Sequence, residues 1–310
     1  MNYQLRSVGT ANVFPSEDVT LQLTTLTSVM KTCVAVGTTR RGILDTEVGN
    51  FRLDMHYNLY KESVPNFREQ RNNLLHLLKG YKVGVGDIVS TALFHGTTDV
   101  AYVGRNGIRI LGAGRSAGNG KRAYLWHHYK PLLRASQLAA DGIICEPDCH
   151  KVPITYSADC VTGVISAPNG AYGVFHSMAK KLANPKDNII QKMIQAFYEL
   201  WCIQPEDLEI AFYPSASPSV YEVDEDFAKM FDEKYVTREY VKKPHLDLES
   251  LAVDLAFGYG VRDIATSDHS TAWGDMESLR GSEHSIMANY EVGNSNGQNI
   301  VFAIPKAMLD

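Results

Sequence analysis

Residues 154–176 read ITYSADCVTGVISAPNGAYGVFH, and this stretch decides the predicted fold. It contains three short runs rich in β-branched and aromatic residues, Ile154–Ser157, Val161–Ala167 and Ala171–His176, and such runs are typical of strands. The Pro-Asn-Gly triplet at 168–170 joins the last two runs and favours a tight turn between antiparallel strands. The stretch therefore predicts strands that follow one another directly, without a helix between them.

The same kinds of pattern continue on both sides of this stretch. Further strands are predicted at Thr32–Thr38, Asp87–Phe94, Gly142–Cys145, Leu208–Tyr213, His284–Val292 and Asn299–Ile304. Apolar residues at helical spacing predict three helices, at about 63–80, 187–201 and 248–257. Because strands outnumber helices and several are consecutive, we predict an α+β fold with a mixed β-sheet core and helices packed on the outside.

One segment interrupts this pattern. Between about residues 104 and 134, glycines alternate with arginines and lysines, but their spacing matches neither a P-loop nor a dinucleotide fingerprint. We interpret the segment as a surface insertion with solvated charge, with a phosphate cradle as the alternative. The length of 310 residues would allow two domains, yet no boundary is visible. We therefore predict a single domain, 1–310, that carries this insertion.

The composition narrows the class of protein. Thirty basic and thirty-five acidic residues leave a net charge of −5, so general binding to nucleic acid is not expected. No apolar run is long enough for a spanning helix, and the N-terminal residues do not resemble a signal peptide. Five cysteines are too few for a disulfide framework and suit a reducing compartment. We expect a cytoplasmic protein that binds no membrane; its oligomeric state cannot be predicted.

Three residues at the ends of predicted strands are candidates for chemistry. His95 follows the strand predicted at 87–94, Cys160 precedes Val161, and His176 closes the next strand. Two imidazoles and a thiolate are ligands that suit zinc, and three protein ligands leave a fourth position open, as catalytic zinc requires. Spacing alone leaves the alternative of an inert buried cysteine and hydrogen-bonded histidines.

Two neighbouring features have simpler interpretations. The Cys-x-x-x-Cys-His spacing of Cys145, Cys149 and His150 resembles a second metal site, but a surface loop is the favoured interpretation. Asp159, next to Cys160, is interpreted as a turn residue whose carboxylate binds backbone amides.

Several short blocks, in the same order, match a known family over about residues 32–305. They are Gly37–Gly42, Asn66–Arg71, Phe94–Gly96, Ala140–Gly142, Ser157–Cys160, Gly173–His176, Tyr221–Val223 and Ser278–Arg280. Together they resemble the bacterial laccase-domain family, also described as polyphenol-oxidase-like or peptidoglycan-editing-factor proteins. Some members are zinc-dependent purine nucleoside phosphorylases with adenosine deaminase activity. The resemblance also implies a fold related in shape to that of Cys-His toxin deamidases.

This resemblance implies roles for individual residues. The zinc ligands and catalytic residues would be His95, Cys160 and His176, and the residues that bind substrate or phosphate would be Arg40, Lys180 and Arg280. For Arg40, an exposed charge is an equally good interpretation, because Arg41 competes for the same position. The implied substrates are a purine nucleoside and phosphate, and either zinc-bound water or phosphate would attack the nucleoside. Zinc is preferred over copper because the ten histidines include no His-x-His pair of the kind that copper oxidases use.

The chain also departs from the family pattern. After His176 it reads Ser-Met-Ala-Lys-Lys where the family has Ala-Gly-Trp-Arg-Gly, and Ser270 replaces a family cysteine. We therefore predict a divergent member and keep two alternatives. One is a metal-free cysteine hydrolase or deamidase in which Cys160 is the nucleophile and His176 the base. The other is a zinc-binding module that has lost its activity.

Overall fold

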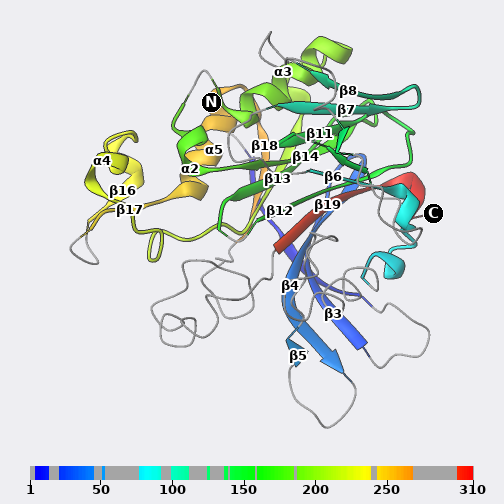
Figure 1. Ribbon diagram of the computed structural model, residues 1–310, viewed down its shortest axis with the longest axis horizontal. Helices are drawn as coiled ribbons and strands as arrows, with labels where there is room; N and C mark the ends of the chain where they lie inside the picture. Colours follow the sequence, from blue (N-terminus) through cyan, green and yellow to red (C-terminus); the bar gives the residue numbers. More distant parts are fainter. Residues whose placement is uncertain are drawn as a thin grey trace.

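Two large β-sheets make up most of the described part of the chain (Figure 1). The computed structural model describes residues 4–13, 21–44, 51–52, 77–91, 99–111, 124–125, 136–138, 140–157, 159–184, 187–238, 243–267 and 299–309. Sheet A has the strand order β1-β18-β15-β13-β14-β11-β7-β8. Its strands are β1 (Gln4–Ser7), β7 (Val100–Gly104), β8 (Gly107–Leu111), β11 (Gly142–Cys145), β13 (Val161–Ser166), β14 (Tyr172–Ser177), β15 (Glu209–Tyr213) and β18 (Asp263–Thr266).

Sheet B has the order β2-β3-β4-β19-β12-β6-β10-β9, with β5 paired to β4. Its strands are β2 (Gly9–Val13), β3 (Leu21–Val29), β4 (Cys33–Leu44), β5 (Phe51–Arg52), β6 (Ile88–Thr91), β9 (Tyr124–Leu125), β10 (Ser136–Leu138), β12 (Val152–Ser157) and β19 (Asn299–Pro305). A two-stranded ribbon pairs β16 (Val236–Thr237) with β17 (His245–Leu246). Both large sheets contain parallel and antiparallel pairs, so the predicted mixed-sheet core is confirmed.

The helices that lie wholly within the described residues are short. They are α2 (Ala179–Leu182), α3 (Ile189–Trp201), α4 (Glu225–Ala228) and α5 (Leu248–Gly258), with single 3₁₀ turns at Val85–Asp87, Pro205–Asp207, Glu233–Tyr235 and Lys306–Met308. The cap residues explain where α3 and α5 begin. Asn188 accepts a hydrogen bond from the amide of Ile190, and Asp247 accepts one from that of Ser250. Both helices lie where the sequence predicts them.

The β13–β14 hairpin confirms the turn predicted from the Pro-Asn-Gly triplet. Gly170 has φ of +97°, a left-handed conformation that glycine adopts without steric cost. The Asn169 side chain accepts a hydrogen bond from the Ala171 amide at 3.0 Å. The turn fixes the register that pairs Val161 with Ser177.

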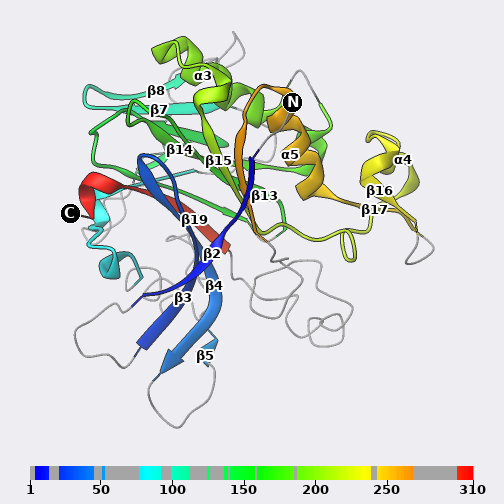
Figure 2. The ribbon, with the colours of Figure 1, turned by 180° about the vertical axis from the view of Figure 1, so that it is seen from behind.

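The molecule is layered, with sheet A between the helices and sheet B (Figures 1 and 2). Residues of β13 and β14 that point outward, such as Ile165 and Phe175, pack in one apolar core with α3 and α5. Residues that point the other way, such as Val164 and Val174, pack in a second core with Val301 of sheet B. A third core covers the face of sheet B that points away from sheet A. It includes Leu77 and Leu78, the first two residues of the helical stretch described at 77–80.

Glycine allows the two sheets to approach closely at one point. A Cβ atom on Gly37 of β4 would lie 2.3 Å from Cδ1 of Tyr213 in β15. The Tyr213 ring therefore rests directly on the backbone of sheet B, and no other residue type fits at position 37 without movement.

Some sequence predictions differ from the structure or lie outside it. Residues 104–111, the start of the predicted insertion, form the turn and second strand of the β7–β8 hairpin at the edge of sheet A. Gly104 and Gly107 lie at the turn of this hairpin, which the sequence pattern did not predict. The strand predicted at His284–Val292 and the first fourteen residues of the predicted helix at 63–80, residues 63–76, lie outside the described residues.

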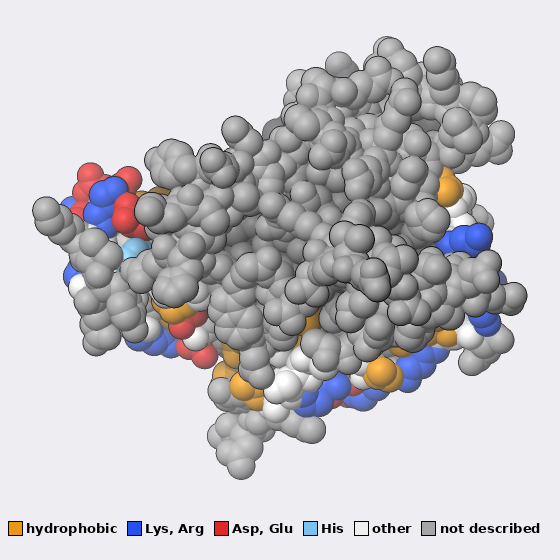
Figure 3. All heavy atoms as spheres, turned by 90° about the horizontal axis from the view of Figure 1, so that it is seen from below, with side chains coloured by type: hydrophobic (Ala, Val, Ile, Leu, Met, Phe, Trp, Pro, Cys, Tyr) orange, Lys and Arg blue, Asp and Glu red, His pale blue; other side chains and the backbone are white. Residues whose placement is uncertain are grey.

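The surface near α4 carries many charges of both signs (Figure 3). They form ion pairs, Lys229 with Asp226, Arg238 with Glu233, and Lys243 with Glu222. Exposed pairs of this kind contribute little stability, about 0–1 kcal/mol each. Within the described ranges, no helix has the length and apolar character needed to cross a membrane.

Candidate functional site

Cys160 lies in the short connection between sheet B and sheet A. It follows the end of β12 by three residues and immediately precedes β13. The Ser157 hydroxyl donates a hydrogen bond to the Cys160 carbonyl at 2.7 Å, and the Ala216 amide donates one to the Asp159 carbonyl at 3.0 Å. These two bonds fix the backbone on both sides of the sulfur, which is half-buried.

His176 lies near the end of β14 and is almost fully buried, with 3% of its surface exposed. In the antiparallel ladder it is opposite Thr162, and its side chain points toward sheet B with that of Val174. If the ladder is continued by one pair, Cys160 falls opposite Met178 and diagonal to His176. Diagonal neighbours on one face of a sheet have Cβ atoms within about 7–8 Å. The hairpin therefore brings Cys160 and His176 to the same end and the same face.

A buried carboxylate that the sequence analysis gave no role lies beside His176. Asp141 precedes β11, and its carbonyl accepts a hydrogen bond from the His176 amide at 2.8 Å. The pairing of Gly142 with Phe175 continues to this residue, so Asp141 and His176 are directly opposite and point to the same face. Asp141 is only 6% exposed. The sequence signal was a charged residue placed directly before an apolar strand, in the block Ala140–Gly142.

These residues belong to a row that crosses sheet A. The pairings of adjacent strands place Tyr213, Thr162, His176 and Asp141 side by side, one each from β15, β13, β14 and the start of β11. All four are buried. Since Tyr213 contacts Gly37, the row is in direct contact with sheet B at one end.

The end of β6 approaches the same corner from sheet B. β6 is parallel to β12, and the Thr91 hydroxyl donates a hydrogen bond to that of Thr155 at 3.1 Å. Both strands therefore run toward the end of the sheet that leads to Cys160. His95 is four residues beyond Thr91, but it lies outside the described residues.

The other predicted site residues are placed only in part. Arg40 is in β4, where the backbone alone is described, and Arg280 lies outside the described residues. Lys180 is exposed on α2, directly after the strand that carries His176. In the described part of the chain, no three His, Cys, Asp or Glu side chains are grouped closely enough to hold a metal ion. Because His95 is not among them, this does not test the predicted zinc site.

Charged residues form a rim next to Asp141. The Asp99 carbonyl accepts a hydrogen bond from the Asp141 amide, and burial raises the pKa of the Asp99 carboxyl while Lys192 lowers it. Lys192 and Lys181 both bind the carboxylate of Asp187, at 2.5 and 2.6 Å. This rim is therefore balanced in charge and held in place by ion pairs.

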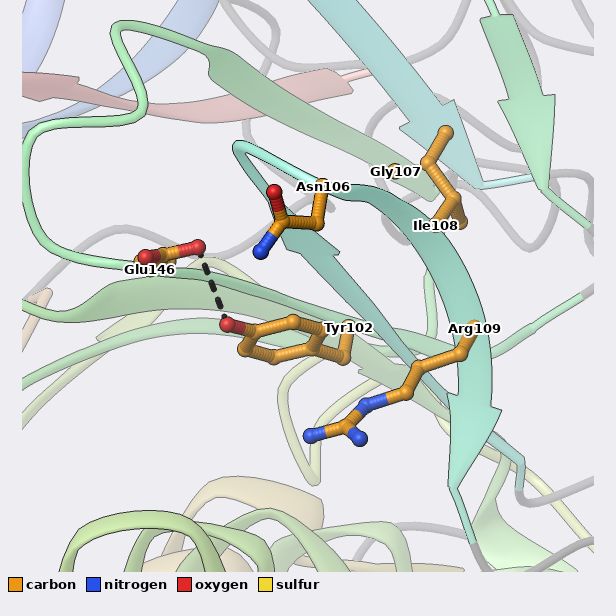
Figure 4. A pocket seen from close by; sticks show the side chains of 6 residues that line it. All are labelled: Tyr102, Asn106, Gly107, Ile108, Arg109 and Glu146. Carbon is orange, nitrogen blue, oxygen red and sulfur yellow. Dashed lines mark hydrogen bonds between the residues drawn. The ribbon is translucent and has the colours of Figure 1, made fainter.

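A separate cavity of about 270 Å³ lies at the β7–β8 hairpin (Figure 4). Its lining residues are Tyr102, Asn106, Gly107, Ile108, Arg109 and Glu146. The Tyr102 hydroxyl donates to the Glu146 carboxylate at 3.0 Å, and the Arg109 guanidinium lies over the Tyr102 ring. β7 is parallel to β11, which begins beside His176, so this cavity is at the opposite end of these strands from the candidate site.

The chain was compared with known families and proteins. The model of the family described as multi-copper polyphenol oxidoreductase laccase matches residues 56–278. The chain belongs to this family. The match spans more than half of the sequence, and it includes Cys160, His176 and Asp141. No match to the chain was found among curated proteins.

Several solved structures share the fold of this chain. YlmD from Geobacillus stearothermophilus is 18% identical, with a TM-score of 0.63 and coverage of 95% of this chain and 99% of that one. The hypothetical protein YfiH of Bacillus licheniformis is 16% identical, with a TM-score of 0.62 and coverage of 89% and 97%. A Neisseria meningitidis protein of the DUF152 family is 16% identical, with a TM-score of 0.60 and coverage of 91% and 98%. The fold is therefore that of these proteins, and the low identity agrees with a divergent sequence.

Proposed function

We propose that this laccase-family protein is a zinc-dependent enzyme that acts on purine nucleosides, by phosphorolysis or by deamination of adenosine. The observation that carries the proposal is the placement of Cys160 and His176 at one end and on one face of the β13–β14 hairpin. A thiolate and an imidazole are donors that zinc prefers, whereas the copper cluster in the family's name requires many more histidines.

The proposed ligands are His95, Cys160 and His176. The route of the chain supports the inclusion of His95, because four residues beyond Thr91 span at most about 13 Å and β6 runs toward the corner where Cys160 lies. When bound, zinc would act as a Lewis acid and would make water a nucleophile at neutral pH. The half-buried position of Cys160 leaves one side of such a site open to a substrate.

The residues around His176 would orient it. Asp141 is buried directly opposite His176, and a carboxylate beside a ligating imidazole typically fixes the ring orientation and the position of its proton. Lys180 is exposed two residues beyond Met178, and its ammonium group could neutralise a phosphate bound at the rim. Arg280 and Arg40 are proposed as further phosphate or substrate contacts.

A metal-free cysteine hydrolase is the second candidate function. The same placement of Cys160 and His176 suits a thiolate nucleophile with an imidazole base. In this reaction His95 has no assigned role, and a chelator would not affect the rate. The two functions therefore differ in their dependence on His95 and on metal.

The test combines elemental analysis with turnover of inosine and adenosine. We expect one zinc ion per chain and loss of both zinc and activity in His95→Ala and in Cys160→Ser. Cys202→Ser is the matched control, since Cys202 is exposed at the end of α3, away from the hairpin, and this variant should keep both. Excess zinc should partly restore the site variants, because the remaining ligands and water can complete a weak site.

Two results would contradict the proposal. An active, chelator-resistant His95→Ala protein would favour the thiolate mechanism. Protein that neither contains zinc nor takes it up on titration would exclude the zinc enzyme altogether. Zinc binding without turnover of any purine nucleoside would instead identify the inactive binding module.

A further inference from the structure

Two free thiols lie at the end of β11 and on the turn that follows it. Cys145 is the last residue of the strand and is fully buried, and Cys149, four residues later, is half-buried. Both cysteines lie beside Tyr172: Cys145 is opposite it in the β11–β14 ladder, and the Cys149 sulfur is 3.7 Å from its hydroxyl. The turn between them is held by bonds from the Glu146 amide to the Val103 carbonyl at 2.9 Å and from the Cys149 amide to the Glu146 carbonyl at 3.3 Å. The thiol pair is therefore part of a defined turn.

The surroundings of Cys149 favour its thiolate. Its sulfur lies 3.7 Å from the hydroxyl of Tyr172, which is itself fixed by a 2.6 Å hydrogen bond to the Lys151 carbonyl. The neighbouring Cys145 thiol has the largest effect and, with Tyr172 and the Lys151 backbone, lowers the pKa of Cys149 to about 7 against the effect of burial. Burial raises the pKa of Cys145 well above the usual range. One thiol is thus partly exposed and acidic, and its neighbour is fully buried.

This arrangement has the parts of a reversible redox centre. Thiols that react with peroxides combine a low pKa with access to solvent and have a second cysteine within reach. The turn also carries Glu146, which lines the cavity at the β7–β8 hairpin (Figure 4), and Cys149 itself is only half-buried.

We propose that Cys149 and Cys145 form a peroxide-reactive dithiol in which Cys149 reacts first and Cys145 resolves. The Cys149 thiolate attacks one oxygen of hydrogen peroxide, the O–O bond breaks, and sulfenic acid and hydroxide form. Cys149 loses two electrons, which reduce the peroxide. The Cys145 sulfur then attacks the sulfenic sulfur, the S–O bond breaks, and the proton of the Cys145 thiol leaves with the hydroxide as water. The product is an intramolecular disulfide.

This centre is independent of the proposed zinc site. Tyr172 and His176 are at opposite ends of β14, and the thiol pair is on the Tyr172 side. It also differs from the metal site that the Cys-x-x-x-Cys-His spacing resembles. His150 is exposed, and no metal-binding group of three forms in the described part of the chain.

The test is a peptide map of the folded, full-length protein after treatment with hydrogen peroxide. We expect a linked peptide that contains Cys145 and Cys149 and has lost two hydrogen atoms. In Cys145→Ala, dimedone should trap sulfenic acid on Cys149, and in Cys149→Ala, Cys145 should stay reduced. Alkylation of Cys149 in the wild-type protein should be half-maximal near pH 7, whereas a free thiol reaches this point near pH 8.5.

The exposed Cys202 provides the internal control. It has no second cysteine nearby in the sequence, so its oxidation shows how an ordinary accessible thiol reacts with peroxide. If peroxide oxidises Cys202 while Cys145 and Cys149 stay reduced, the proposal is wrong. An alkylation midpoint of Cys149 near pH 8.5 or above would overturn it as well. Both measurements use the wild-type chain, so they decide the matter even if a variant at the buried position does not fold.

Discussion

Replacing Gly37 with alanine tests how closely the two sheets pack beside the candidate site. The new Cβ atom would lie 2.3 Å from Cδ1 and 2.7 Å from Cε1 of the Tyr213 ring. Carbon atoms in contact are normally about 3.5–4.0 Å apart, so the ring or the strand must move by about 1 Å. Tyr213 is only 2% exposed and is packed in the core between the sheets. The ring therefore has no open space to enter, and overpacking of this kind costs about 1–3 kcal/mol.

The assay is thermal unfolding, and the matched control is Gly9→Ala. For a chain of this size, a loss of 1–3 kcal/mol corresponds to a fall in Tm of roughly 2–5 °C. A Cβ atom on Gly9, also in a strand of sheet B, would meet only the Thr27 carbonyl oxygen at 3.7 Å, an ordinary contact. This variant should change stability by no more than about 0.5 kcal/mol. Equal melting temperatures for the two variants would refute the described approach of the sheets.

The same substitution also reaches the candidate site. Tyr213 is in the row that continues through Thr162 to His176, so a shift of its ring disturbs the strands that carry the proposed ligands. If the zinc proposal is right, Gly37→Ala should bind zinc more weakly than Gly9→Ala at a temperature where both are folded. The prediction for thermal unfolding does not depend on this zinc measurement.

Three further predictions follow from individual side chains. Arg280→Ala should weaken phosphate-dependent nucleoside cleavage more than deamination; equal losses would mean that Arg280 supports the fold or the whole substrate. Asp141→Asn, which keeps the shape of the side chain, should lower zinc affinity about 10–100-fold in a competition assay with a chelating dye, and unchanged affinity would remove its positioning role. The hydrogen bond from Lys234 lowers the pKa of Asp254 below its usual 3.8, so this carboxylate stabilises the fold at neutral pH and the effect is lost as the pH falls below about 4. Urea unfolding between pH 2 and 7 should show that the free energy of unfolding falls less steeply with decreasing pH in Asp254→Asn than in the wild-type protein. Identical pH dependences would contradict the stabilising role of this carboxylate.

The sequence predicted the turns and helices that depend on contacts between residues close together in the chain. The turn at Gly170 needs only a few residues, and the caps Asn188 and Asp247 lie next to the helices they begin. The turn and both helices were predicted with boundaries close to the observed ones, whereas the two caps are seen only in the structure. The β7–β8 hairpin was not predicted, because Gly104 and Gly107 match the composition of a loop as well as that of a turn.

Pairing between distant segments could not be predicted from the sequence. β6 lies beside β12, and β7 beside β11, although many residues separate the members of each pair. These parallel pairs determine which strand ends meet. Asp141 illustrates the consequence, because its importance depends on the register of β11 against β14 and no signal near position 141 reveals that register.

The order of strands in sheet A explains why the family resemblance consists of short, separated blocks. Tyr213, Thr162, His176 and Asp141 come from four segments that become neighbours only through the pairings β15–β13, β13–β14 and β14–β11. Asp141 and His176 belong to the blocks Ala140–Gly142 and Gly173–His176, whereas Thr162 and Tyr213 lie outside the blocks. Each of the two blocks supplies one residue to the row, so each is short and common when considered alone. The site requires all the pairings at once, and Gly37 must be small enough for sheet B to close over the row.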